Sequence, residues 1–178
     1  MQVLSRQRGV SLIEVMMAVL IFSIGLLGLA GLMVMATRSN HAAYLRTQVI
    51  FLANNMANRM SGNPAGVWNG NYNSTAYPVA AASAGCGSGA ACSPADLATH
   101  DQQMWSSQLR TFLPNPLAKI KCDGTGAVGY NPTAQINLRP PYGGTCAMTI
   151  QWTEVVTGNQ TTQSSAATPQ IFAWKFQP

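Results

Sequence analysis

Charged residues are scarce in this sequence, and acidic ones especially so. Only 8% of the 178 residues are Asp, Glu, Lys or Arg, whereas about a quarter is usual in soluble domains. The sequence shows no paired carboxylates, no phosphate-binding loop and no Ser-His-Asp set with a supporting motif. We interpret the acids in its last two thirds as capping and surface groups: Asp96, Asp101, Asp123 and Glu154. The sequence therefore predicts neither an enzyme nor a bound cofactor.

Histidine is also scarce, which bears on the role of the four cysteines. A zinc site would favour closely spaced cysteine pairs or nearby histidines, but the two histidines are isolated. An even number of cysteines in a loop-rich region indicates disulfides in an oxidising compartment. Of three possible pairings, we predict Cys86–Cys92, within a Gly-, Ser- and Ala-rich segment, and Cys122–Cys146, which flanks a Gly- and Pro-rich stretch.

Most of the apolar content lies in one block near the N-terminus. The residues from Val15 to Ala36 include no charged side chain, and Ser23 is the main polar interruption. A membrane-spanning helix needs about 20 such residues. A buried core helix is the alternative, but such helices usually carry a polar stripe. We therefore predict a membrane span, which makes the membrane an expected partner.

The helical pattern continues beyond the span to about Ser61. In this second half, apolar residues recur at spacings of three or four, which indicates an amphipathic helix: Ala42, Leu45, Val49, Leu52, Met56 and Met60. Gly62 and Pro64 then predict the end of the helix. We expect one continuous helix, from about Ser11, with an apolar first half and an amphipathic second half.

The remaining chain has the composition of a small mixed domain. We expect short strands near Val67–Trp68 and Tyr77–Val79. A further helix should start at Ser93, which is a good N-cap, with Pro94 in its first turn and Asp96 completing the cap. Its apolar stripe is predicted to face the core: Leu97, Met104, Trp105, Leu109 and Phe112.

Two late segments have the alternating pattern of strands. In "CAMTIQW", Met148, Ile150 and Trp152 share one face, and "QIFAWKF" near the C-terminus is expected to pair with this strand. The predicted fold class is therefore α+β, in which the long N-terminal helix packs on a small antiparallel sheet with one extra helix.

The N-terminal segment resembles the signal of type IV pilins. In "RGVSLIEVMMAVLIFSIGLLGLAGL", a short basic leader is followed by a glycine, a mature start and Glu as the fifth mature residue. A secretory signal peptide would have a shorter apolar core. Ser11 and Glu14 also fit a capping box, which we interpret as a secondary role. The sequence departs from the family in having Val10, where Phe is usual.

The resemblance implies a processing mechanism and a mode of assembly. A prepilin peptidase would cut between Gly9 and Val10, and Val10 would then be N-methylated. Glu14 would pair with the N-terminal amine of an adjoining subunit. The implied parts are a cleaved leader (1–9), a membrane-spanning or filament-core half-helix (10–37), an amphipathic half-helix (38–62) and a disulfide-bearing head (63–178).

The same resemblance implies location, partners and function. The protein would be a single-pass inner-membrane protein with a cytoplasmic N-terminus and a periplasmic head, and would then enter a pilus. Its expected partners are the prepilin peptidase, other minor and major pilins and the assembly platform. We expect a minor pilin at or near the pilus tip; the alternatives are a pseudopilin of a type II secretion system and a DNA-binding or adhesive subunit. Nucleic-acid binding by Trp68, Tyr72 and Tyr77 with Lys119 and Lys121 is the less favoured interpretation.

Overall fold

The computed structural model describes residues 9, 11–80, 86, 91–124, 142–155 and 167–178. It divides into two compact units, Met1–Ala43 and Tyr44–Pro178. Helix α1 (Leu12–Gly62) contributes to both units, and its bounds lie within one residue of the predicted ones. The predicted helix is therefore confirmed, and each unit can be considered by itself.

The first unit consists, in its described residues, of the N-terminal part of α1. The helix begins where the carbonyl oxygen of Ser11 accepts bonds from the backbone N–H groups of Glu14 (3.0 Å) and Val15 (3.3 Å). Large apolar side chains from Leu12 to Met35 are exposed on all sides of the helix. The helix is long and apolar enough to cross a membrane.

The second unit is a small α+β domain built on the C-terminal part of α1. As predicted, Leu45, Val49, Leu52, Met56 and Met60 are buried, together with two alanines. The carbonyl oxygen of Leu52 accepts a 2.9 Å bond from the indole Nε1 of Trp105 on the next long helix. The amphipathic pattern of α1 is therefore explained by packing inside this unit.

A short helix, α2 (Pro64–Trp68), directly follows α1. The predicted strand at Val67–Trp68 is therefore wrong. The side chain of Asn63 accepts a 3.1 Å bond from the N–H of Gly66, and Pro64 occupies the first turn. Asn followed by Pro is a helix-start signal. This signal outweighs the strand preference of Val67, which is β-branched, and of Trp68, which is aromatic.

Helix α3 (Pro94–Phe112) starts as predicted, because the Ser93 side chain accepts a 3.1 Å bond from the Asp96 N–H. Trp105 and Leu109 are buried, whereas Met104 and Phe112 are 45% and 37% exposed. The predicted apolar stripe is thus wrong at these two positions. The buried face of α3 instead includes small and polar residues and consists of Ala98, Asp101, Trp105, Ser106 and Leu109.

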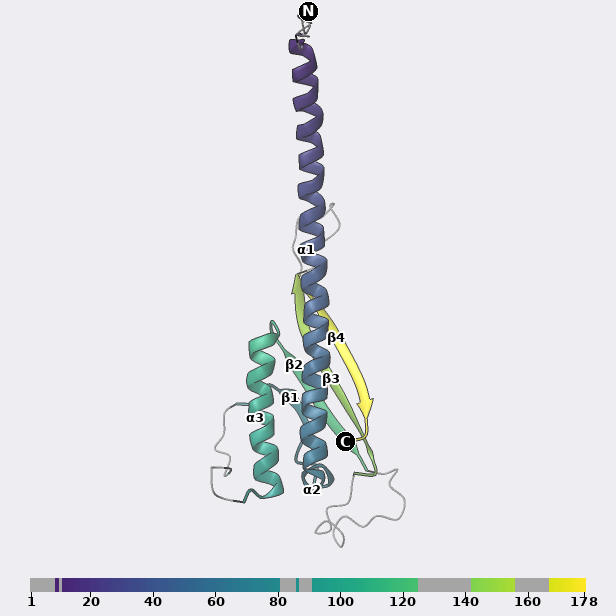
Figure 1. The fold of residues 1–178 in the computed structure, drawn as a ribbon. Coiled ribbons are helices and arrows are strands. Elements are labelled where there is room, and N and C mark those ends of the chain that lie inside the picture. Colours follow the sequence, from purple (N-terminus) through teal and green to yellow (C-terminus); the bar gives the residue numbers. More distant parts are fainter. Residues whose placement is uncertain (1–8, 10, 81–85, 87–90, 125–141, 156–166) are drawn as a thin grey trace, which may run out of the picture. The chain divides into compact units, whose positions relative to one another are not determined.

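Four antiparallel strands form one sheet in the order β1-β2-β3-β4 (Figure 1). Their bounds are β1 (Ser74–Tyr77), β2 (Leu117–Asp123), β3 (Thr145–Val155) and β4 (Ala167–Phe176). The α+β class and the pairing of the two late strands are confirmed. Strand β1 ends at Tyr77, so the strand predicted over Tyr77–Val79 is displaced toward the N-terminus.

The sheet has one buried face and one exposed face. On β3, Cys146, Met148, Ile150 and Trp152 are buried, as the alternation predicts. These side chains join the buried residues of α1 and α3 in one hydrophobic core. Within the second unit, the C-terminal part of α1 and the sheet are therefore layers around a common core (Figure 1).

Candidate functional site

The first candidate site lies at the start of α1. Glu14 lies in the first turn of the helix, and its side chain is exposed. Among the described residues, its carboxylate takes part in no hydrogen bond or ion pair, and the capping interaction with the Ser11 hydroxyl is not formed. A carboxylate near a helix N-terminus is stabilised by the helix dipole. Within one chain, the acid has no partner of opposite charge in the part that is described.

The expected cleavage junction lies just before this acid. Gly9 is exposed, and Val10 lies outside the described residues. A Cβ atom at Gly9 would meet no atom within 4 Å. The packing of the described residues therefore does not require glycine at this position, and a binding partner such as a protease could impose that requirement.

The glycines inside the apolar half of α1 show the same property. A Cβ at Gly25, Gly28 or Gly31 would also meet nothing within 4 Å. Glycine in a helix costs about 1 kcal/mol relative to alanine, and the described residues of the single chain supply no compensating contact. Small residues permit close approach of helices in membranes and helix bundles, so these positions are suited to packing against another molecule.

Apart from Glu14, the surface of the N-terminal part of α1 is suited to a non-aqueous environment. None of the most apolar stretch of α1 is buried in the structure. The Ser23 hydroxyl donates to the Val19 carbonyl oxygen at 2.7 Å, and the Thr37 hydroxyl donates to that of Val34 at 2.9 Å. These polar side chains are satisfied within the helix itself, as a lipid-exposed or subunit-exposed helix requires.

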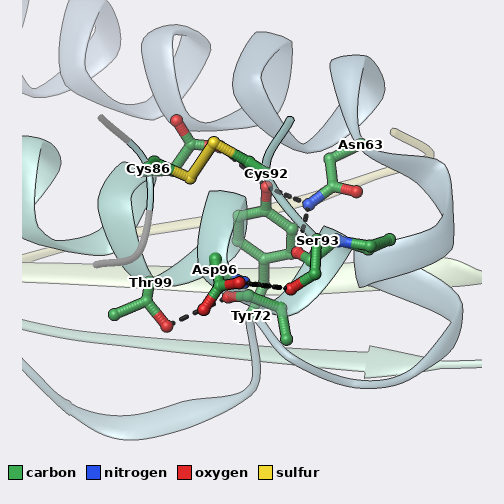
Figure 2. The surroundings of a disulfide bond; sticks show 10 residues. Asn63, Tyr72, Cys86, Cys92, Ser93, Asp96 and Thr99 are labelled. Atoms are coloured by element: carbon green, nitrogen blue, oxygen red, sulfur yellow. Dashed lines mark hydrogen bonds between the residues drawn. A yellow bond between two sulfur atoms is a disulfide. The ribbon is translucent and has the colours of Figure 1, made fainter. Parts of the chain in front are cut away.

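A buried polar network in the second unit was missed by the sequence analysis. The Arg59 guanidinium donates to Asp101 Oδ1 at 2.9 Å, and the Tyr72 hydroxyl donates to Asp101 Oδ2 at 2.8 Å. The Asn63 amide donates in turn to Tyr72 Oη (3.1 Å) and to the Pro94 carbonyl oxygen (2.8 Å). Figure 2 shows Asn63 and Tyr72 beside the start of α3. The network joins the end of α1 to α3.

This network corrects the interpretation of Asp101, which is buried and paired and is not a surface group. Burial raises the pKa of Tyr72, and its hydrogen bond to Asp101 raises it further. Burial alone raises the pKa of Tyr77. Glu154 is likewise buried and accepts a 3.0 Å bond from the indole of Trp152, so it is not a surface group either.

Two disulfides are present in the second unit, Cys86–Cys92 and Cys122–Cys146. Cys122 and Cys146 are direct partners in the β2–β3 register, so this bond crosses the buried part of the sheet. Cys92 directly precedes the N-cap of α3, and Figure 2 shows the Cys86–Cys92 bond near this helix start. Among the described residues, no group of three His, Cys, Asp or Glu is arranged to hold a metal ion.

The aromatic residues considered for nucleic-acid stacking do not form an exposed set. Tyr72 and Tyr77 are 0% and 1% exposed. Trp68 is half-buried and contacts Tyr142 edge to face, with ring centroids 4.6 Å apart. These rings belong to the core and its border, so the stacking arrangement proposed for a DNA-binding subunit is wrong.

Comparison with known proteins gives a match at the first site. Residues 4–30 match the family model described as "Prokaryotic N-terminal methylation motif". The match covers the leader and the first part of α1, including Gly9, Val10 and Glu14. No curated protein and no solved structure is significantly similar to the chain. The motif indicates a type IV pilin-like or pseudopilin protein, and it implies processing by a prepilin peptidase and assembly with pilins.

Proposed function

We propose that this protein is a minor pilin of the type IV pilus, incorporated at or near the tip, where it aids assembly and contributes to adhesion or twitching motility. One observation carries the proposal: the methylation motif is followed by a helix whose apolar surface is exposed in the isolated chain. Such a surface needs lipid or neighbouring subunits to cover it. The sequence "IGLLGLAGL" resembles that of the minor pilin called type IV pilus modification protein PilV.

The protein is proposed to act in two stages, first in the inner membrane and then in the pilus. The leader (1–9) is held on the cytoplasmic side while residues 10–37 span the inner membrane, and the amphipathic half-helix (38–62) and the head (63–178) lie in the periplasm. After cleavage and N-methylation at Val10, the assembly platform moves the helix from the bilayer into the pilus. The disulfides support the periplasmic placement, because such bonds persist in oxidising compartments.

Glu14 has a defined role in this proposal. The carboxylate is exposed and unpaired among the described residues of its own chain, and cleavage creates a cationic amine four residues before it. Two such charges are each costly to bury alone, and pairing between subunits offsets part of that cost. The pair would therefore set the axial register of one subunit against the next.

The processing step is tested by the mass of the mature protein. We expect intact-mass measurement and N-terminal sequencing to show a chain that begins at Val10, with one added methyl group. Gly9→Trp should block cleavage, because a bulky side chain would fill a narrow protease site, whereas it should not disturb the fold, since a side chain at Gly9 meets no neighbour. A mature chain that still carries residues 1–9 would contradict the proposal.

The assembly role of Glu14 is tested by Glu14→Gln, compared with Ser11→Ala. Gln preserves the size and the capping ability of the side chain but not its charge. We expect normal membrane insertion and normal cleavage of Glu14→Gln, but much less protein in sheared pili by immunoblot. Ser11→Ala, which removes only the capping hydroxyl, should assemble normally. Normal recovery of Glu14→Gln from pili would reject the pairing role, and capping would then be the better account of Glu14.

A pseudopilin of a type II secretion system is the alternative within the same class, because the motif is common to both. The two are separated by location: a minor pilin is recovered in sheared pili, and its deletion lowers piliation. A pseudopilin is absent from pili, and its deletion blocks protein secretion while piliation stays normal.

A further inference from the structure

The last strand of the sheet, β4, has an open outer edge (Figure 1). Among the described residues, β4 pairs only with β3, and their register is continuous from Cys146 to Val155 without a bulge. The opposite edge is different, because β1 has four residues and its register with β2 is interrupted between Ser74 and Tyr77. Short or bulged edges discourage pairing with another chain, whereas a long regular edge favours it.

The direction of the backbone groups in β4 follows from a hydrogen bond on β3. The Thr153 N–H donates at 3.1 Å to the carbonyl oxygen of Pro114, which precedes β2, so this N–H points away from β4. Thr153 is the register partner of Pro169. The two residues thus form a non-hydrogen-bonded pair, in which the backbone groups of each residue point away from the other. The backbone of Pro169 therefore faces the open edge, where proline is tolerated because it has no N–H.

This direction alternates from residue to residue along a strand. The N–H and C=O groups of Ile171, Ala173 and Lys175 therefore also point to the open edge, and those of the residues between them point to β3. The other end of the ladder agrees. The Cys122 N–H donates to Asn73 Oδ1 at 2.7 Å, away from β3, so the register partner of Cys122 on β3 directs its own groups toward β4.

The inner face of β4 is only partly covered. Phe172, Trp174 and Phe176 are half-buried, whereas Met148 and Ile150 on the same face of β3 are 1% and 0% exposed. The rings of Trp174 and Phe176 stack with their centroids 4.7 Å apart. Aromatic side chains are enriched in protein interfaces. The apolar layer of the core thus extends to the open edge, where an added strand would continue it.

These features define the chemistry of a fitting partner. Backbone groups at a strand edge are satisfied by an extended segment that adds as a further strand. The half-buried rings favour apolar side chains at every second position of that segment. Lys175 is exposed on the outer face and forms no ion pair among the described residues, so it favours an acidic neighbour on the added strand. A second copy of β4 does not fit, because β4 contains no acidic residue.

We propose that the outer edge of β4 binds an extended segment of another protein by strand addition. The segment carries apolar residues at alternate positions, next to Phe172, Trp174 and Phe176, and an acidic residue next to Lys175. The inference does not depend on the proposed place of the protein in the pilus, because the sheet belongs to the second unit alone.

The test uses the full-length chain in non-ionic detergent and a short fluorescent peptide in which valine alternates with threonine and one threonine is replaced by glutamate. We expect saturable binding by anisotropy, and no binding of a peptide with the same residues in an order that lacks the alternation. Hydrogen exchange followed by NMR should show that the N–H groups of Ile171, Ala173 and Lys175 become protected in the complex. Those of Phe172 and Trp174 should be protected with and without the peptide.

Ala173→Pro and Ala173→Thr are the matched variants. Proline removes the outward N–H and places its ring in the path of the added strand, while the bonds of β4 to β3 are kept. We expect Ala173→Pro to weaken peptide binding by about tenfold or more, and Ala173→Thr, which keeps the N–H, to bind like the wild type. Circular dichroism should show that both variants are folded.

Lys175→Glu is a further variant that leaves the backbone of β4 unchanged. It should weaken binding of the glutamate peptide by up to about fivefold, and a peptide with lysine in place of glutamate should restore the loss. The proposal is overturned if the wild-type chain binds neither peptide, if it binds the peptide without alternation equally well, or if Ala173→Pro binds as tightly as the wild type. A wild-type dimer that Ala173→Pro dissociates would also reject it, in favour of a second copy at this edge.

Discussion

Both parts of the continuous helix α1 carry apolar side chains. These side chains are exposed in the first part, whereas one side of the second part is buried. Leu20, in the first unit, is 52% exposed, and Leu52, in the second, is fully buried. Burial of a leucine side chain stabilises a fold by about 2 kcal/mol, so the second part contributes to the folding of its own chain. The first part gains this energy only from lipid or from other subunits. The helix therefore serves folding at one end and assembly at the other.

The largest expected effect comes from a matched pair of leucine substitutions. Leu52→Ala should destabilise the second unit by about 2 to 5 kcal/mol, because it leaves a cavity in the core. Leu20→Ala should change its stability by less than about 0.5 kcal/mol. The measurement is chemical denaturation followed by tryptophan fluorescence, because all four tryptophans lie in the second unit. Equal shifts of the two denaturation midpoints would show that the two parts of α1 are not energetically distinct.

A second prediction concerns how the end of α1 is fixed to the second unit. Asp101→Asn removes the charge that faces Arg59 and keeps an acceptor for the Tyr72 hydroxyl. We expect a loss of about 2 kcal/mol, since the bond to a charged group is lost while Arg59, one-quarter exposed, can partly hydrate. Asp96→Asn on the same helix is the control and should cost less than about 1 kcal/mol. Similar losses for both variants would show that the Arg59–Asp101 ion pair contributes no more to stability than a helix-capping bond.

The effect that is smallest at neutral pH, because it arises only in the alkaline range, is a change of stability with pH. Burial raises the pKa of Tyr72 and Tyr77 in the folded chain, whereas tyrosine in the unfolded chain ionises near pH 10. Above about pH 10 the unfolded chain therefore binds fewer protons than the folded chain, and stability falls as pH rises. Below that pH this contribution is fully present. Each tyrosine should lower the free energy of unfolding by about 1.4 kcal/mol per pH unit.

The control for this titration is a pair of Tyr→Phe variants. Tyr72→Phe should make the alkaline decline shallower, although it also lowers stability at neutral pH because Asp101 and Asn63 lose a partner. Tyr44→Phe should leave the decline unchanged, because Tyr44 is exposed. A decline of the same steepness in all three proteins would assign the effect to other groups.

The elements that the sequence predicted well are those with local signals. The spacing of Leu45, Val49 and Leu52 specifies the buried side of α1 without knowledge of its partners. The alternation in β3 and the N-cap of α3 are likewise properties of a few consecutive residues. The first candidate site is equally local, because the motif places Gly9, Val10 and Glu14 within six residues of one another.

What the sequence did not predict depends on contacts between distant residues. Asp101 is buried because Arg59, 42 positions away, supplies the opposite charge, and neither residue signals the other locally. Met104 lies outside the core because α3 turns the side of Ala98 and Asp101 inward. The open edge of β4 is likewise defined only by the order of the strands in the sheet. Pairing across the fold, and not the composition of a segment, decided these features.

The Cys122–Cys146 bond also has a mechanical consequence. The two cysteines are register partners on β2 and β3 and lie 24 positions apart in the chain. A pulling force can peel β1 from β2 or β4 from β3, but it meets a covalent bond between the two central strands. The bond encloses 24 positions, which correspond to about 80 Å of extended chain. These positions cannot extend when the molecule is stretched. The sheet can thus yield at its edges under tension while its centre keeps a fixed length.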